Sequence, residues 1–200
     1  MQEIEFLYDF VSNNSYLVHQ VLPGIAAQHG VKLRYTPVFL GAVFKATGNA
    51  PPFVTFRDVP AKLAYQTKEI ERFIARHDIR YHMSPHFPLN TLPVLRGAIY
   101  ARGQPWEADY IDAIFNAMWI HGQQIDRPEV IEDILTEAGL PKARILAAME
   151  DPEIKAKLTE TTDQAVARGV FGAPSMLLGE ELFFGKDSLP DLVYALTGQA

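Results

Sequence analysis

The segment Asp9–Tyr16 places two serines where a protein can bind an anion or a thiolate. Ser12 and Ser15 stand where a strand-like stretch ends and a helix-like stretch begins. The first turn of a helix presents unpaired backbone N–H groups and the positive end of the helix dipole, which stabilise negative charge. No histidine and acid accompany Ser12 in a pattern that would activate a serine nucleophile. We therefore expect Ser12 to donate a hydrogen bond to a thiolate that a ligand supplies. The alternative is that Ser12, Asn13 or Asn14 only caps the helix.

A proline at the head of a predicted strand marks a second candidate segment. Gly172, Ala173 and Pro174 precede a strand-like stretch that begins at Ser175. A small residue before such a proline suits a cis peptide bond. The N–H and C=O of Ala173 would then face outward near the first helix and pair, as at a strand edge, with the backbone of a bound cysteinyl peptide. The alternative is an ordinary proline of an edge strand.

Lys186 and Asp187 belong to a third segment, just before the last predicted helix. The Asp187 carboxylate can hold an α-ammonium group while neighbouring N–H groups hold an α-carboxylate. That combination would recognise the glutamyl end of glutathione. The alternative is that Asp187 serves only as the N-cap of the helix.

Other reactive groupings are weaker or absent from the sequence. His82 and His86 have the spacing of a helical metal pair, but Pro85 between them interrupts a regular helix, and we expect no metal site. His19 and His29 are expected at the surface of the first helix. The sequence holds no GxSxG, HExxH or GxGxxG motif, which disfavours serine hydrolases, zinc peptidases and dinucleotide enzymes.

The composition restricts the class of protein further. The chain has 200 residues, of which 48% are hydrophobic, enough for a sizeable core. Its net charge of -6 argues against a nucleic-acid partner held by phosphate contacts. The cysteine count is 0, so thiol chemistry requires a thiol from a ligand. No secretory signal or membrane span is visible, and we expect a cytoplasmic protein with no membrane partner.

The patterning of apolar residues predicts the elements that position these segments. Alternating apolar residues or short apolar runs predict strands at 3–8, 31–38, 175–178 and 182–184. Apolar residues at helical spacing predict helices at 14–30, 59–77, 91–101, 106–120, 128–138, 142–149, 152–168 and 187–196. The turn Gly179-Glu180 suits a tight hairpin between the last two strands.

The order of these elements indicates an α/β fold. A parallel β-α-β unit is followed by a block of helices and then by a β-β-α unit. This is the element order of a thioredoxin-like domain interrupted by an all-helical insertion. We assign residues 1–38 and 168–200 to the thioredoxin-like domain and residues 39–167 to the helical insertion domain.

Together, these features resemble the 2-hydroxychromene-2-carboxylate isomerase family and the related kappa-class glutathione transferases, in the DsbA-like branch of the thioredoxin superfamily. The resemblance covers nearly the whole chain. It rests on five motifs in order: Asp9-Phe10-Val11-Ser12-x-x-Ser15-Tyr16-Leu17, Gly48-Asn49-x-Pro51-Pro52, Phe87-Pro88-Leu89-Asn90-Thr91-Leu92, Val170-Phe171-Gly172-Ala173-Pro174 and Phe184-Gly185-Lys186-Asp187. Five ordered matches are far more specific than any one of them.

The resemblance implies that the cofactor is glutathione and that the three segments bind it. Ser12 matches the serine of the family that contacts the glutathione sulfur. Ala173, before the cis-proline Pro174, matches the residue that binds the cysteinyl backbone. Lys186 and Asp187 match the positions that bind the γ-glutamyl group.

The resemblance also implies where the substrate binds, and it shows where this chain departs from the family. Asn49 and Asn90 match polar positions that line the pocket between the two domains. The family often has proline and an aromatic residue where this chain has Asn13 and Asn14, and arginine where it has Ser188. Since the first change alters the rim of the site, it affects the identity of the substrate more than the binding of glutathione.

The activity implied by the resemblance is a glutathione-dependent cis-trans isomerisation of the 2-hydroxychromene-2-carboxylate type, in bacterial aromatic catabolism. The substrate would be a small aromatic molecule, and the protein would be a homodimer. Two alternatives stay open at this point. One is a kappa-like glutathione transferase or peroxidase, and the other is a non-catalytic module that binds glutathione or a peptide at the sheet edge near Pro174.

Overall fold

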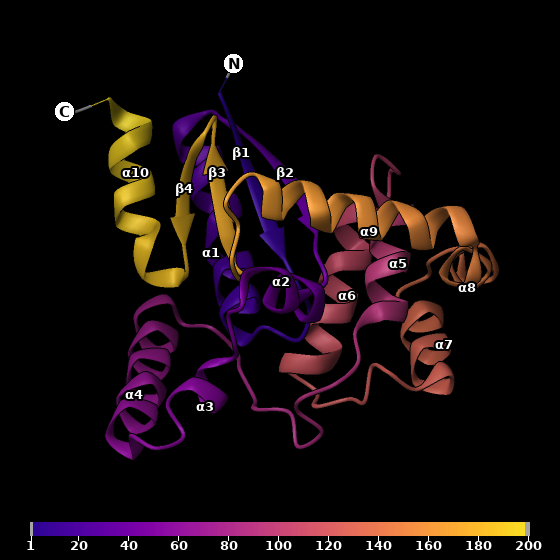
Figure 1. Cartoon of the computed structure of the whole chain (residues 1–200). Helices are drawn as coiled ribbons and strands as arrows, with labels where there is room; N and C mark the ends of the chain where they lie inside the picture. The colour runs from indigo at the N-terminus through magenta and orange to yellow at the C-terminus, as the bar shows by residue number, and fades with distance from the viewer. Residues whose placement is uncertain (1, 199–200) are drawn as a thin grey trace.

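The computed structural model describes residues 2–198, which contain a four-stranded sheet with helices on both faces (Figure 1). The strands are β1 (Glu3–Tyr8), β2 (Lys32–Pro37), β3 (Ser175–Leu178) and β4 (Glu181–Phe184). Their order is β2-β1-β3-β4, with β1 parallel to β2 and antiparallel to β3, and β3 antiparallel to β4. The predicted α/β fold, with a β-α-β unit followed by helices and then by a β-β-α unit, is therefore confirmed.

The helices follow the predicted order. The helices of the β-α-β and β-β-α units are α1 (Asn13–His29) and α10 (Leu189–Thr197), the latter preceded by the short 3-10 helix η1 (Lys186–Ser188). Between β2 and β3 lie α2 (Leu40–Thr47), α3 (Pro52–Thr55), α4 (Pro60–His77), α5 (Leu92–Ala101), α6 (Glu107–Trp119), α7 (Pro128–Glu137), α8 (Lys142–Glu150) and α9 (Pro152–Ala167). Described residues 39–167 contain no strand, as predicted.

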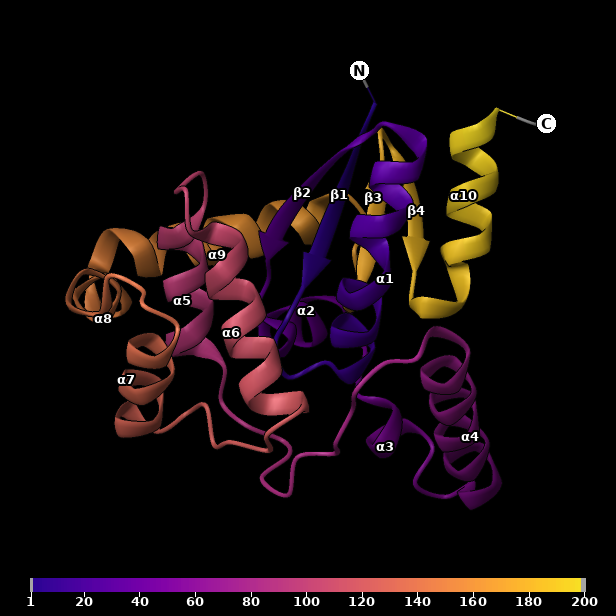
Figure 2. The same cartoon turned by 180° about the vertical axis from the view of Figure 1, so that it is seen from behind.

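The side chains of alternate residues in β1 pack on opposite faces of the sheet. Ile4 and Phe6 pack with the side of the sheet that α1 and α10 cover, which is the near side in Figure 2. Leu7 points to the other face, where it joins Val43 of α2 and Ala165 of α9 in a second cluster. In Figure 1, α9 crosses in front of this face. Helices α2 and α9 therefore pack directly on the sheet, although both lie in the stretch assigned to the insertion, and the division into two domains stays a prediction.

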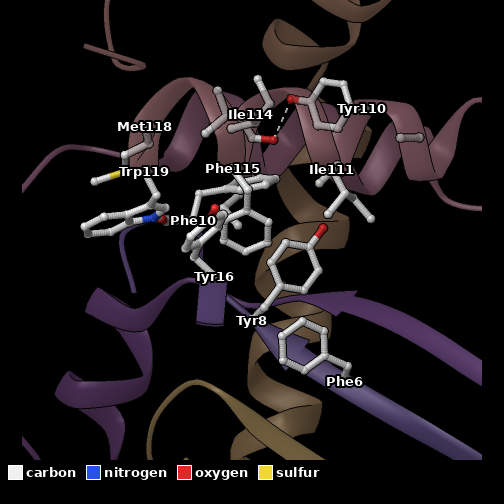
Figure 3. Packing of buried hydrophobic residues seen from close by; sticks show 14 of the residues in the cluster. Phe6, Tyr8, Phe10, Tyr16, Tyr110, Ile111, Ile114, Phe115, Met118 and Trp119 are labelled. Carbon is white, nitrogen blue, oxygen red and sulfur yellow. Dashed lines mark hydrogen bonds between the residues drawn. The ribbon is translucent and has the colours of Figure 1, made fainter. Parts of the chain in front are cut away.

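An aromatic cluster joins the sheet to the helical part of the chain. Tyr8 and Phe10, at the end of β1 and just beyond it, contact Phe115 of α6 with ring centroids 5.6 and 4.8 Å apart. The Trp119 indole N–H donates to the Phe10 carbonyl oxygen at 2.8 Å. Figure 3 shows these rings packed between the strand and the helix, and the Phe10 and Phe115 rings meet edge to face. This contact fixes the position of the loop that leads from β1 into α1.

The sequence did not predict α2 and α3. Both are short, and α3 begins at Pro52, the last residue of the Gly48–Pro52 motif, where no helix was predicted. Proline lacks an N–H but is accepted in the first turn of a helix, where the N–H would have no partner. Pro51 is therefore the N-cap of α3, and Pro52 is its first residue. Residues 1, 199 and 200, which we assigned to the thioredoxin-like domain, lie outside the described residues.

Candidate functional site

The register of the sheet brings the three predicted segments together. Leu7, near the end of β1, pairs with Ser175 at the start of β3, and Ser175 pairs with Phe184 at the end of β4. The residues that follow β1, precede β3 and follow β4 therefore meet at one end of the sheet. This is the lower end in Figure 1, which faces α3 and α4.

Ser12 is the N-cap of α1, as one of the alternatives predicted. Its backbone is extended (φ -84°, ψ 112°), and its Oγ accepts a hydrogen bond from the Ser15 N–H at 3.1 Å. The same hydroxyl donates to the Ala173 carbonyl oxygen at 3.0 Å. Ser12 thus joins the start of the helix to the proline loop. Its single proton is held by a neutral acceptor, and a charged acceptor would form a stronger bond.

The peptide bond between Ala173 and Pro174 is cis, which confirms the prediction. The carbonyl groups around it are engaged within the protein: Ser175 Oγ donates to the Gly172 oxygen at 2.8 Å, and the Gly185 N–H donates to the Pro174 oxygen at 2.9 Å. The Ala173 oxygen accepts from Ser12 and keeps a second lone pair. Pairing of Ala173 with a bound peptide stays a prediction that this geometry permits.

Lys186 and Asp187 form an ion pair with one buried and one exposed partner. The Lys186 side chain is 4% exposed, and its Nζ donates to Oδ1 of Asp187, whose side chain is 73% exposed. The same Nζ lies 5.5 Å from the centre of the Phe73 ring in α4. Asp187 lies inside η1, and α10 begins only after Ser188, so the prediction that Asp187 caps this helix is wrong. Its carboxylate remains open to a ligand on one side.

Asn49 and Asn90 are exposed, and the side chain of each makes a hydrogen bond to the backbone. The Asn49 amide donates to the Phe171 carbonyl oxygen at 2.8 Å, which ties the loop after α2 to the loop that carries Pro174. Asn90 Oδ1 accepts from the Leu92 N–H at 3.1 Å, at the start of α5. Contact of these amides with a substrate stays a prediction.

Sequence reasoning missed the role of Asp9, which is fully buried three residues before Ser12. Its Oδ1 accepts from the Thr91 hydroxyl at 2.6 Å and from the Val11 N–H at 3.1 Å, and its Oδ2 accepts from the Leu40 N–H at 2.9 Å. Burial raises the pKa of Asp9 from 3.8 to about 6, and these hydrogen bonds oppose the shift. The carboxyl group holds the loop that carries Ser12 against the starts of α2 and α5. In the sequence, this buried role is indicated by a single acid within the apolar run from Phe6 to Val11.

The first turn of α1 contains two buried polar side-chain atoms without a hydrogen-bond partner within residues 2–198, Asn14 Oδ1 and Ser15 Oγ. Both residues lie within one helical turn of Ser12. A buried polar atom without a partner costs about 1 to 3 kcal/mol. The first turn of α1 therefore buries polar side-chain atoms at the end of the sheet where the three segments meet.

His19 lies in the interior, and the expectation that it is a surface residue is wrong. It is 7% exposed, and its Nδ1 and Nε2 lie 2.8 Å from the Tyr35 hydroxyl and 2.7 Å from Asp112 Oδ1. Helix α6, which carries Asp112, packs over this face of α1, and the sequence of α1 alone does not reveal that cover. Among residues 2–198, no group of three or more histidines and acids is arranged to hold a metal ion. No helix in the same part of the chain has the length and apolarity to cross a membrane.

Comparisons with known proteins agree with this geometry. The family model described as the DSBA-like thioredoxin domain matches residues 3–197. The chain is 28% identical over 186 residues to the 2-hydroxychromene-2-carboxylate isomerase of Pseudomonas putida, which covers 93% of this chain and 90% of that relative. It is 26% identical over 201 residues to glutathione S-transferase kappa 1 of Caenorhabditis elegans, covering 94% and 87%. A solved structure of a 2-hydroxychromene-2-carboxylate isomerase has a TM-score of 0.85 at 28% identity and covers 98% of this chain and 94% of that one.

Proposed function

Since the chain belongs to the family of DSBA-like thioredoxin domains, we propose that it is a glutathione-dependent isomerase of the 2-hydroxychromene-2-carboxylate type. The observation that carries the proposal is the contact of Ser12, at the start of α1, with Ala173 in the cis-proline loop. A serine at this place can hold a thiolate but cannot form a disulfide, and the chain has a cysteine count of 0. The chain therefore has no thiol for disulfide exchange, whereas chemistry with a ligand's thiol suits the site.

Glutathione matches the groups that the site offers. Its sulfur would lie near Ser12, where the N-terminus of α1 favours negative charge. Its cysteinyl backbone would pair with Ala173 beside Pro174. Its γ-glutamyl group would lie at Lys186 and Asp187, where the exposed carboxylate of Asp187, held by the buried Lys186, suits an ammonium group.

When bound, glutathione would supply a thiolate that adds reversibly to the conjugated double bond of the substrate, so that this bond can rotate before the thiolate leaves. The chain's own task is to keep the sulfur ionised and in place. Ser12 can turn its proton from the neutral Ala173 carbonyl group to the sulfur, and a charge-assisted bond is roughly twice as strong as a neutral one. The α1 dipole acts in the same direction. Holding sulfur and double bond together supplies further rate through orientation.

The substrate in this proposal is a small aromatic molecule of the chromene type. The exposed amides of Asn49 and Asn90 are suited to hydrogen-bond its polar groups. The similarity to isomerases supports a reaction in bacterial aromatic catabolism. We also propose a cytoplasmic homodimer, as the family resemblance implies.

A kappa-like glutathione transferase or peroxidase is the second candidate, because a relative with that name is 26% identical over most of the chain. The two reactions differ in their stoichiometry. An isomerase leaves the amount of glutathione unchanged, whereas a transferase or peroxidase consumes it. Counting free thiol during turnover of a chromene substrate therefore separates the two.

The test of the site is Ser12→Ala, with Asp151→Ala as the matched control. Loss of one charge-assisted hydrogen bond should raise the thiol pKa of bound glutathione by about 1 to 2 units and lower turnover, while the affinity for the protonated thiol form of glutathione stays unchanged. Asp151 caps α9 by accepting from the Glu153 N–H at 2.7 Å, far from the site in sequence. Removing that cap should cost about 1 kcal/mol of stability and leave the thiol pKa unchanged.

Ultraviolet titration of the bound thiolate and thermal melting report the two effects separately. A lower melting temperature of Ser12→Ala with an unmoved thiol pKa would leave Ser12 as a cap only. Absence of glutathione binding to the unmodified protein in calorimetry would refute the proposed function.

A further inference from the structure

The segment 78–91 between α4 and α5 brings a tyrosine against the first turns of α1. The ring of Tyr81 stacks on Trp119, with centroids 5.8 Å apart and planes at 11°, and lies 6.3 Å from the ring of Tyr16. The Tyr16 hydroxyl donates to the carbonyl oxygen of Arg80 at 2.5 Å, which fixes the backbone beside Tyr81. The Tyr81 ring is therefore held from two sides at the start of the helix that Ser12 caps.

The Tyr81 residue is half-buried, and its hydroxyl has a weak acceptor. It donates to Sδ of the exposed Met83 at 3.3 Å. A thioether is a weak acceptor, so an oxygen that reaches this place would replace it readily. Burial raises the pKa of Tyr81, and a hydrogen bond with the side chain of Asn13 opposes the shift without reversing it. The phenol therefore keeps its proton at neutral pH and acts as a donor.

Asn13 adjoins Ser12 and lies near this phenol, where it opposes the rise in pKa that burial causes. Its Oδ1 accepts from the Asn14 N–H at 2.8 Å, which leaves the amide N–H groups to face Tyr81. The proton of the Tyr81 hydroxyl points to Met83. The Tyr81 side chain thus packs beside Tyr16, one helical turn after Ser12.

We propose that Tyr81 is a further catalytic residue whose hydroxyl donates a hydrogen bond to the keto oxygen of an aromatic oxo-acid substrate, in place of its bond to Met83. This inference rests on the proposed isomerase function. A benzylidenepyruvate, the ring-opened keto form of such a chromene, has a carbon–carbon double bond conjugated to a ketone. When a thiolate adds to that double bond, its electron pair forms a new double bond to the carbonyl carbon, and the electron pair of the C=O bond moves onto the keto oxygen. The pair returns when the nucleophile leaves, so no proton has to be transferred. A donor fixed at this oxygen stabilises the charge while it is present.

The experiment compares Tyr81→Phe with Tyr194→Phe, which removes a hydroxyl from a tyrosine that is 58% exposed on α10. The first readout is the Kd for benzylidenepyruvate in the absence of glutathione. A bond to a neutral keto oxygen predicts an increase of about 2- to 10-fold in Tyr81→Phe. The second readout is kcat for isomerisation with glutathione present. A bond to the charged oxygen predicts a fall of about 10- to 100-fold.

Two further measurements distinguish this role from a structural one. The thiol pKa of bound glutathione should stay unchanged in Tyr81→Phe, in contrast to Ser12→Ala. Met83→Leu, which removes only the weak acceptor, should leave kcat within about 2-fold of the unmodified protein. Unchanged Kd and kcat in Tyr81→Phe would overturn the inference.

The failure of the proposed function gives a different result. If the unmodified protein binds benzylidenepyruvate but isomerises no chromene, the isomerase proposal fails. The Kd comparison then decides by itself whether Tyr81 contacts the keto oxygen. Melting temperatures within a few degrees of the unmodified protein should accompany both tyrosine variants, since the ring and its stacking on Trp119 are kept.

Discussion

The buried carboxyl group of Asp9 makes stability depend on pH in a direction opposite to that of a paired surface acid. Burial raises its pKa from 3.8 to about 6, despite hydrogen bonds from Thr91, Val11 and Leu40. Between about pH 4 and pH 6, the folded state therefore binds a proton that the unfolded state releases. By linkage, the free energy of unfolding falls as the pH rises through this window.

The size of the effect follows from the shift. A difference of about 2 pKa units corresponds to about 3 kcal/mol. We expect Asp9→Asn to remove this component while keeping the size of the side chain and one acceptor oxygen. The variant loses an acceptor for one of the three donors, which costs about 1 to 3 kcal/mol at any pH. As the pH rises from 4 to 7.5, however, the free energy of unfolding of the variant should increase by about 3 kcal/mol relative to that of the unmodified protein.

Urea denaturation of both proteins at several pH values measures how the difference between their free energies of unfolding changes with pH. The contributions of all other titrating groups cancel in this difference. Asp163→Asn is the control, since Asp163 is an exposed acid on α9. Its difference from the unmodified protein should vary by less than about 0.5 kcal/mol over the same range. A difference for Asp9→Asn that stays constant with pH would refute the argument that burial dominates at this carboxyl group.

Two further predictions concern packing and ligand binding. Gly97→Ala should cost about 1 to 3 kcal/mol, because a Cβ there would lie 2.1 Å from the Tyr110 hydroxyl oxygen. Gly24→Ala has nothing within 4 Å and should stabilise the protein by up to about 1 kcal/mol, so thermal melting of the pair compares crowded and open helical sites. Asp187→Asn keeps an acceptor for the buried Lys186 but removes the negative charge. It should weaken glutathione binding by about 1 to 3 kcal/mol in calorimetry, and an unchanged affinity would remove Asp187 from the glutathione site.

Much of the fold follows from local patterns in the sequence. The bounds of the strand 175–178 and the start of α7 at Pro128 were predicted to the residue. The spacing of apolar residues and a proline at a helix start are local properties of the sequence. The helix stop at Gly30 was also predicted, and Gly30 has the left-handed conformation (φ 64°) that glycine adopts at least cost. The short helices α2 and α3 were missed because a few residues give too little periodicity to detect.

The sequence by itself determined which chemistry is open to this protein. A cysteine count of 0, the serine pair at Ser12 and Ser15, and the small residue before Pro174 already indicated a site for a ligand's thiol. They also carried the resemblance to a family that the comparisons confirm. These conclusions need only residue types and their spacing.

The tertiary structure decided which polar groups are buried and with whom they pair. Asp9 holds two helix starts that lie 31 and 82 residues away, and His19 is covered by α6, 93 residues away. Lys186 is buried against Phe73, so that only Asp187 of this pair faces solvent. The burial and the hydrogen-bond partners of a residue are set by segments far apart in the chain. The pKa of a carboxyl group depends on both, and so does the group to which a tyrosine hydroxyl donates its proton. No local pattern encodes them, because each is a property of the packed molecule.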